Sequence, residues 1–217
     1  MSDNMDRPKV HVNVAMSADG KIALPKREEV KISGEEDFER VHKLRNEVDA
    51  IIVGIGTVLA DDPKLTVKDR YIESHPNHPL KVILDSKNRT PKDAQLFDKG
   101  EWLIATATDK ASGEGRIKCG DGKVDIEILL DHLDSRGIEK VLVEGGGEVI
   151  NSFFETGAVD VYTVFVGSLI IGGREAPTPV DGEGALGEEE IIDLELIDSE
   201  RLDDGLLLRY EVRNIND

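Results

Sequence analysis

Short runs of β-branched and aliphatic residues recur along the chain and alternate with polar segments of helical spacing. Several runs are almost wholly apolar, which is typical of strands that are buried on both faces of a parallel sheet. The pattern therefore predicts a mostly parallel sheet. Its strands are expected at Val10–Ala15, Ala50–Val53, Leu80–Leu84, Trp102–Ala105, Lys140–Val143 and Val161–Val166.

Three helices are expected between these strands. In segment 32–50, Ser33 followed three residues later by Glu36 has the pattern of a capping box. A second helix is expected over about 148–156 and a weaker one over about 128–136. Four apolar residues fall on one side of the first helix: Phe38, Val41, Leu44 and Val48.

The C-terminal segment 191–213 reads as two strands joined through a polar turn, which predicts an antiparallel hairpin. Alternating strands and helices followed by a hairpin indicate an α/β fold with a mixed, mostly parallel sheet. No repeat and no Pro/Ser linker divides the chain, so we expect a single domain over 1–217, with residues 1–8 as a flexible extension. The polar stretch 172–190 is expected to be a functional or mobile loop.

The charge balance narrows the possible partners. Lys and Arg total 27 and Asp and Glu 45, which gives a formal net charge of −18. A field of that sign argues against nucleic acid and anionic membranes as partners, so an anionic ligand would need a local cationic pocket. The single cysteine, Cys119, rules out an intrachain disulfide. Without a signal-like or membrane-spanning apolar run, we expect a soluble, cytoplasmic protein.

Two glycine-rich segments follow predicted strands. GIGTVLADDP (54–63) has G-x-G but Leu59 replaces the third glycine of the dinucleotide fingerprint, and neither segment ends as a P-loop does. In the second segment, Gly145, Gly146 and Gly147 pass from a strand into a helix. Their N–H groups could face a pyrophosphate at the positive helix end. A tight turn with close packing of helix on sheet explains the same glycines, and both interpretations stay open.

Few polar residues point to chemistry on their own. Ser33 reads most simply as a helix cap, Arg45 as a complement to the helix dipole, and Asp61 with Asp62 as turn residues. Glu144 ends a buried strand, where a carboxylate must be paired or must act chemically. The five histidines show no metal-ligand spacing and there is one cysteine, so no metal is expected. No G-x-S-x-G elbow for a serine nucleophile is present. Of the kinds of chemistry considered, proton transfer or redox chemistry on a bound cofactor is the one that stays open.

Six segments occur in an order that resembles one family along nearly the whole chain. With these segments the chain resembles the reductases of riboflavin biosynthesis, both the stand-alone archaeal and fungal enzymes and the C-terminal half of the bacterial deaminase-reductase. No deaminase zinc motif is present, which favours the stand-alone form. The segments are VAMSADGKIA (14–23), ISGEEDFERVHKLRNEVDAIIVGIGTVLADDPKLTV (32–67), VILDSKNRTP (82–91), KCGDGKVD (118–125), VLVEGGGEVINSFF (141–154) and IIGGREAPTPVDGEG (170–184).

This resemblance implies a fold similar to dihydrofolate reductase, a homodimer, and NADPH or sometimes NADH as the cofactor. The implied reaction reduces the ribosylamino group of 2,5-diamino-6-ribosylamino-4(3H)-pyrimidinone 5′-phosphate to a ribitylamino group. Two alternatives stay open: another reductase of this fold that acts on a pterin or pyrimidine, and a non-catalytic nucleotide-binding regulator.

The resemblance also implies the ligand contacts. The positions that match cofactor ligands are Thr57, Asp61, Asp85, Ser86, Lys87, Asn88, Val124, Gly145, Gly146, Gly147 and Glu148. Those that match substrate ligands are Ser33, Arg45, Leu65, Lys68 and Glu144.

Individual residues of these sets carry further expectations. Lys68 stands where bacterial members have arginine, and it keeps the charge but loses bidentate phosphate binding. A carboxylate at Glu148 is expected to turn to solvent. Lys87 and Arg89 could favour the 2′-phosphate of NADPH. Glu144 is the preferred substrate-orienting carboxylate, whereas Asp19 reads more simply as a D-G turn residue.

Overall fold

The computed structural model describes residues 7–28, 30–73, 75–109 and 113–213. Its contacts divide the chain into two compact units. The first comprises the chain up to Val10 and His42–Val143, and the second comprises His11–Val41 and the chain from Glu144 onward. The expected single domain over 1–217 stays a prediction. Most of the expected extension, residues 1–6, lies outside the described residues, while Pro8 is buried.

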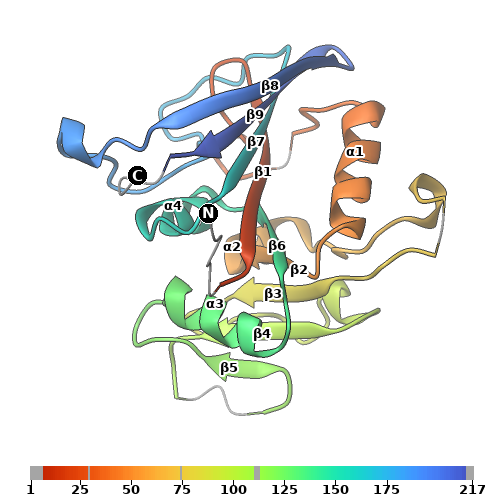
Figure 1. The fold of residues 1–217 in the computed structure, drawn as a ribbon, viewed down its shortest axis with the longest axis vertical. Helices are drawn as coiled ribbons and strands as arrows, with labels where there is room; N and C mark the ends of the chain where they lie inside the picture. Colours follow the sequence, from red (N-terminus) through yellow and green to blue (C-terminus); the bar gives the residue numbers. More distant parts are fainter. Residues whose placement is uncertain (1–6, 29, 74, 110–112, 214–217) are drawn as a thin grey trace, which may run out of the picture. The chain divides into compact units, whose positions relative to one another are not determined.

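The first unit is built on parallel strands. These follow one another in space in the order β5-β4-β3-β2, with β6 beside β2, and the printed pairs of β2 to β5 are all parallel (Figure 1). Val53, Ile83 and Ile104 come from three neighbouring strands and lie in one apolar core, as expected for strands buried on both faces. The strands are β2 (Ala50–Gly54), β3 (Leu80–Leu84), β4 (Trp102–Thr106), β5 (Arg116–Lys118) and β6 (Lys140–Gly145), the last reaching into the second unit.

Helices of the first unit follow the strands closely. Helix α2 (Ile55–Asp61) begins directly after β2, and helix α3 (Ile126–Ser135) precedes β6. The side chain of Asp125 caps α3 by accepting a hydrogen bond from the N–H group of Ile128 at 3.2 Å. Two short 3₁₀ helices, η1 (Asp69–Tyr71) and η2 (Gln95–Phe97), lie in the loops on either side of β3.

The second unit combines parallel and antiparallel pairs. Strand β1 (Lys9–Ser17) is parallel to β7 (Val161–Gly167), and the hairpin of β8 (Leu194–Leu202) and β9 (Gly205–Val212) adds antiparallel to β7. In Figure 1 this hairpin is the blue pair beside β7. Side chains of these four strands form both apolar and polar contacts within the second unit.

Helix α4 (Gly147–Glu155) packs on β7 through aromatic rings. Phe154 of α4 meets Tyr162 of β7 edge-on with 5.3 Å between ring centroids, and Tyr162 stacks in turn on Tyr210 of β9. A separate apolar cluster joins Ile32, Phe165 and Leu207. Because Phe165 and Leu207 are register partners on β7 and β9, this cluster fastens the hairpin to the parallel strands.

Most of the expected elements are confirmed. All six predicted strands occur within two residues of their expected limits, and the C-terminal hairpin is antiparallel. The mixed, mostly parallel α/β fold is confirmed. The helices expected over 148–156 and 128–136 occur at 147–155 and 126–135. Segment 172–190 is a loop apart from the turn of 3₁₀ helix η3 (Glu188–Glu190). The three-residue strand β5 was missed, because it is too short to show a pattern.

One prediction for helix α1 (Glu35–Asn46) is wrong. Its N-terminal N–H groups are capped by Asp203 from the β8–β9 turn, not by Ser33 in a local capping box. The four apolar residues are not all buried: Val48 lies in the apolar core and Leu44 packs against it, but the first member, Phe38, is exposed. Phe38 is 39% exposed, whereas Asp37 and His42 are 2% and 1% exposed. The helix therefore turns polar side chains inward, where they form hydrogen bonds and an ion pair, as well as apolar ones.

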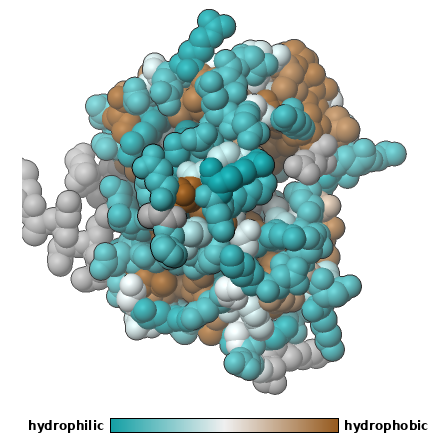
Figure 2. Space-filling model, turned by 90° about the vertical axis from the view of Figure 1, so that its right-hand side faces the viewer, coloured by the Kyte–Doolittle hydropathy of each residue, from teal (hydrophilic) through white to brown (hydrophobic). Residues whose placement is uncertain are grey.

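The surface reflects the charged composition. Figure 2 shows a face on which hydrophilic residues predominate and hydrophobic residues gather in smaller patches. Among the described residues, every helix is too short or too polar to cross a membrane.

Candidate functional site

The loop after β3 brings several of the expected cofactor residues together. Ser86 accepts a hydrogen bond through Oγ from the N–H group of Val124 at 3.2 Å, so this loop is joined to the one that leads into α3. The backbone turns tightly here, because the N–H group of Asn88 donates to the carbonyl of Asp85 at 3.0 Å and Asn88 has φ +53°. Lys87, at the outer position of this turn, is exposed.

The buried side chain of Asp85 stabilises the conformation of this loop. Its side chain is fully buried, and its Oδ2 accepts hydrogen bonds from the N–H and hydroxyl groups of Thr90 at 2.7 and 2.8 Å. Its Oδ1 lies 3.8 Å from Nε of Arg89 and accepts no hydrogen bond in the described part of the chain. A buried carboxylate with these partners orders the loop that carries Ser86, Lys87 and Asn88.

Helix α2 and the turn after it hold three further expected residues. Thr57 is half-buried and Asp61 is exposed. The turn continues through Asp62, which has φ +41° and whose Oδ1 and Oδ2 accept hydrogen bonds from Gln95 at 2.8 and 3.0 Å. Asp62 is therefore a structural residue. Leu65 is 4% exposed with φ +50°, a conformation that non-glycine residues rarely adopt and that often marks functional segments.

The C-terminal half of α1 meets the segment that contains Leu65 and Lys68. The guanidinium group of Arg45 donates to the carbonyl of Thr66 at 3.4 Å. The N–H group of Lys68 donates to Nδ1 of His42 at 3.3 Å. Three of the five expected substrate ligands, Arg45, Leu65 and Lys68, thus lie in one small region of the first unit, and two of them are cations.

The triple glycine is a strand-to-helix junction in the second unit, as expected. Gly145 ends β6, Gly146 has φ +78° at the start of α4, and a Cβ on Gly147 would come within 2.5 Å of the carbonyl oxygen of Thr178. The N–H group of Asp181 donates to the carbonyl of Gly147 at 3.2 Å. Close packing against the loop 178–181 therefore explains Gly147, and positive φ explains Gly146.

Glu148 turns its side chain to solvent, as expected. The side chain is 77% exposed and lies 3.6 Å from the guanidinium group of Arg27. A contact of residue 148 with an anionic cofactor would therefore come from its N–H group in the first turn of α4, where the helix dipole favours negative charge.

Asp19 is a structural turn residue. Its carboxylate accepts hydrogen bonds from the hydroxyl group of Ser17 at 2.6 Å and from the N–H groups of Ile171 and Gly172 at 3.0 and 2.7 Å. The hydrogen bond from Ser17, with those from the backbone, lowers the pKa of Asp19 to about 2. A carboxylate so held stays ionised and cannot serve as a general acid near neutral pH.

Glu144 and Ser33, the remaining expected substrate ligands, lie in the second unit. Glu144 is half-buried near the end of β6, one residue before Gly145, and Ser33 is half-buried just before α1. In the described part of the chain, no group of three or more His, Cys, Asp or Glu side chains is arranged to hold a metal ion.

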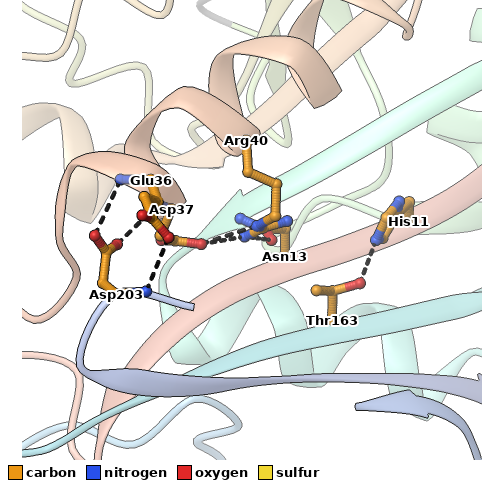
Figure 3. A network of polar contacts seen from close by, with 7 residues as sticks. All are labelled: His11, Asn13, Glu36, Asp37, Arg40, Thr163 and Asp203. Carbon is orange, nitrogen blue, oxygen red and sulfur yellow. Dashed lines mark hydrogen bonds and ion pairs between the residues drawn. The ribbon is translucent and has the colours of Figure 1, made fainter. Parts of the chain in front are cut away.

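A polar network in the second unit was missed by sequence reasoning (Figure 3). Arg40 of α1 donates to Asp37 at 2.9 Å and to the side-chain oxygen of Asn13 on β1 at 2.8 Å. Two residues earlier in β1, Nε2 of His11 lies 2.7 Å from the hydroxyl oxygen of Thr163 on β7. The network ties the first turns of α1 to the strands beside it, and no local sequence pattern indicates it.

These features define an α/β protein with glycine-rich strand-to-helix turns, a buried carboxylate that orders the loop after β3, and a cationic cluster around residue 68. The chain belongs to the RibD C-terminal domain family, whose model matches residues 8–208.

Similar proteins extend over nearly the whole chain. It is 39% identical over 208 residues to the 2,5-diamino-6-ribosylamino-4(3H)-pyrimidinone 5′-phosphate reductase of Archaeoglobus fulgidus, covering 88% of this chain and 94% of that protein. It is 40% identical over 217 residues to the protein of the same name from Methanothermobacter thermautotrophicus, covering 95% and 99%.

Solved structures share the fold. Acinetobacter baumannii RibD matches with a TM-score of 0.83 and 25% identity over 96% of this chain, which spans 59% of that longer protein. The riboflavin biosynthesis reductase Rib7 of Saccharomyces cerevisiae matches with a TM-score of 0.78 and 23% identity, covering 98% of this chain and 93% of that one. The expected similarity to reductases of the dihydrofolate-reductase-like fold is confirmed.

Proposed function

We propose that this protein is an NADPH-dependent reductase of riboflavin biosynthesis. It would reduce the ribosylamino group of 2,5-diamino-6-ribosylamino-4(3H)-pyrimidinone 5′-phosphate to the ribitylamino group. The observation that carries the proposal is the identity of 39% and 40%, over almost the full length of both partners, to two archaeal proteins named for this reaction. The single buried cysteine, Cys119, suits a reducing compartment, and we place the enzyme in the cytoplasm.

The cofactor would be held by backbone N–H groups, polar side chains and one exposed cation, Lys87. In the first unit these would be Thr57 and Asp61 of α2, Ser86, Lys87 and Asn88 after β3, and Val124. Asp85 would act by ordering their loop, since its carboxylate is buried against Thr90. In the second unit the N–H groups of 146–148 would face phosphate oxygens, because they stand at a helix N-terminus with Gly146 at φ +78°. These features fit a dinucleotide phosphate, and NADPH when bound supplies the hydride.

The substrate would be held at its phosphate by Arg45 and Lys68, whose positive charge contrasts with the net charge of −18. Leu65 would contribute through its backbone, because its side chain is 4% exposed and packs in the core. Ser33 and Glu144 would also bind substrate, and Glu144 would orient the ribosylamino group for reduction. Holding reactants in place and keeping water out are the protein's main contributions to hydride transfer.

We also propose that the protein is a homodimer and that the β8–β9 hairpin contributes to the interface. Strand β8 lies at the outer edge of the second unit's strands, and long apolar side chains on this hairpin are exposed. A second copy of the chain would cover them, since such patches on soluble proteins mark association surfaces. Light scattering of the wild type and of Leu196→Glu tests this: a dimer is expected for the first and a monomer for the second. The residues are Leu194 (38% exposed), Leu196 (53%), Ile197 (42%) and Leu206 (43%).

The function is tested by following NADPH oxidation at the nicotinamide absorbance band. Loss of NADPH that depends on the ribosylaminopyrimidine 5′-phosphate and yields the ribityl product is expected. Dihydrofolate is the matched second substrate. Turnover of dihydrofolate alone would show a different reductase of the same fold, and tight NADPH binding without turnover of either compound would leave only a nucleotide-binding protein.

A further inference from the structure

His42 is a buried histidine that the expected ligand sets do not include. It lies in α1, three residues before Arg45, and is 1% exposed. Three cations act on its imidazole: Arg45 on its own helix, Lys68, and Arg70 of η1. Burial and three nearby cations disfavour the imidazolium, so His42 is not placed to be a proton donor. Its contacts indicate instead that it holds a neighbouring segment of the chain in place.

Contacts of His42 and Arg45 hold the segment 66–71. Nδ1 of His42 accepts the N–H group of Lys68 at 3.3 Å. The imidazole ring stacks on the ring of Tyr71, with 5.2 Å between centroids and 17° between planes. Arg45 adds a hydrogen bond to the carbonyl of Thr66 at 3.4 Å. One turn of α1 thus fixes this segment at three successive places, on both sides of Lys68.

The hydrogen bond requires one protonation state. Since Nδ1 accepts a hydrogen bond from the Lys68 N–H group, the imidazole must be neutral with its own proton on Nε2. Burial, together with the positive charges of Arg45, Lys68 and Arg70, lowers the pKa of His42 to about 4. The three cations that would bind an anionic ligand therefore also keep His42 neutral, with Nδ1 as the hydrogen-bond acceptor.

We propose that His42 is a positioning residue for a phosphate site: it sets the backbone at Lys68 so that the side chains of Lys68, Arg45 and Arg70 converge on one phosphate group of the ligand. Arg70 joins the site as a third cation, and its guanidinium group lies 4.5 Å from the centroid of the Tyr71 ring that stacks on His42. A guanidinium group here supplies the paired donors that a lysine at position 68 lacks. The identity of the ligand as the ribosylaminopyrimidine phosphate rests on the proposed function, but the phosphate site itself does not.

Two substitutions separate the contacts of His42. His42→Phe keeps a ring to stack on Tyr71 but removes the acceptor for the Lys68 N–H group. His42→Asn loses the ring but places an amide oxygen near the position of Nδ1. His132→Asn on α3 is the matched control, since His132 is a partly exposed histidine of the same unit outside this cluster. Circular dichroism and thermal unfolding of each variant establish that it is folded.

The probe is inorganic phosphate, titrated by calorimetry into the full-length protein, with KM and kcat for the ribosylaminopyrimidine phosphate measured alongside. His42→Phe is expected to weaken phosphate binding and raise KM by at least about tenfold, with kcat changed by less than about threefold. His42→Asn should recover most of that affinity, and His132→Asn should match the wild type. Arg70→Ala should weaken phosphate binding by about tenfold.

The opposite results would overturn the proposal. Phosphate binding and KM that are unchanged in His42→Phe would remove the positioning role, as would a wild-type protein that does not bind phosphate. If His42→Phe does not fold, nitrogen NMR of the wild type decides: a proton on Nδ1 at neutral pH contradicts the proposal, and one on Nε2 supports it. Phosphate binding that depends on His42 in a protein without reductase activity would refute the proposed function and keep this site.

Discussion

The carboxylate of Asp203 lies where a side chain on Gly34 would stand. A Cβ on Gly34 would come within 2.4 Å of both Cγ and Oδ1 of Asp203. The two carboxylate oxygens accept the N–H groups of Glu36 and Asp37 at 3.2 and 3.0 Å, and the Asp203 N–H group donates to the Glu36 carboxylate at 3.3 Å (Figure 3). A residue of the C-terminal hairpin turn thus caps α1 through Glu36, which lies 167 positions earlier in the chain.

Removing this cap should destabilise the protein. Asp203→Ala is expected to lower the free energy of unfolding by about 1 kcal/mol, the usual loss for an N-cap side chain. Gly34→Ala should also destabilise the wild type, because its methyl group would displace the carboxylate. In an Asp203→Ala background the same change should cost less. Urea unfolding of the four proteins measures the coupling, and strictly additive effects would contradict the arrangement.

The cap also shows what the sequence can predict and what it cannot. Buried strands are encoded locally as runs of β-branched residues, so all six expected strands and the hairpin were found. Ser33 and Glu36 have the spacing of a capping box, yet the helix is capped by the carboxylate of Asp203, which is distant in the sequence. Lys81 in β3 is a second case: it is fully buried and its ammonium group donates to the carbonyl of Leu96 at 2.6 Å, although it interrupts an apolar run. Partners supplied by tertiary structure leave no local signal.

The residues of the candidate site likewise divide into those that the sequence can predict and those that it cannot. The strand-to-helix junction at Gly145–Gly147 could be predicted from the sequence, because consecutive glycines follow an apolar run there. Arg45, Leu65 and Lys68 came from family resemblance alone, and their proximity in the first unit supports it. His42 was missed, since a histidine inside a helix carries no signal until Lys68 and Tyr71 are seen beside it.

The only cysteine should be unreactive in the folded protein. Cys119 is 1% exposed, and burial together with the charge of Asp125 raises the pKa of its thiol to about 11. The thiolate fraction at pH 8 is then about 10⁻³, and the thiolate is the reactive form. Iodoacetamide at pH 8 should therefore label the protein only in denaturant, as read by mass spectrometry. Rapid labelling of the native protein would show that the thiol is accessible.

Stability should fall in a defined window of acid pH because of His42. Its pKa is about 4 in the folded protein, against 6.5 for an ordinary histidine, because burial and the charges of Arg45, Lys68 and Arg70 disfavour the imidazolium. As pH falls from about 6.5 to about 4, the unfolded chain binds this proton and the folded protein does not. Unfolding then becomes easier, by up to about 1.4 kcal/mol per pH unit.

His42→Asn lacks this titration and serves as the comparison. Free energies of unfolding measured between pH 7 and pH 4 should decline more steeply for the wild type than for the variant. Below about pH 4 the two curves should run parallel, since both states of the wild type are then protonated. Equal slopes throughout would show that His42 titrates normally in the folded protein.

Cofactor choice should depend on the exposed cation in the loop after β3. Lys87 is exposed beside Asn88, whereas the guanidinium group of Arg89 lies 3.8 Å from the buried Asp85. Lys87 is therefore the better placed to meet the 2′-phosphate of NADPH. Lys87→Ala should lower kcat/KM for NADPH by at least about tenfold and leave that for NADH nearly unchanged. The exposed Lys92 gives the control, Lys92→Ala, and equal kcat/KM for both cofactors in the wild type would remove the preference itself.

The role of Glu144 can be separated from that of the glycines that follow it. Glu144→Gln keeps the size and the hydrogen-bonding reach of the side chain but removes its charge. If the carboxylate orients the ribosylamino group, activity should fall by at least about tenfold while NADPH still binds with its wild-type affinity, as measured by nicotinamide fluorescence. Glu139→Gln is the matched control, because Glu139 is an exposed carboxylate just before the same strand.

Two outcomes would change the assignment in different ways. Wild-type turnover in Glu144→Gln would remove this carboxylate from the mechanism and leave the substrate to be oriented by Ser33, Arg45 and Lys68. A parallel loss of turnover and of NADPH affinity would instead place Glu144 in the support of the junction at Gly145–Gly147, which lies directly after it in β6 and α4. A fall in kcat with unchanged cofactor affinity is the result that a substrate-orienting carboxylate requires, because its interaction is made with the reacting group and not with the dinucleotide.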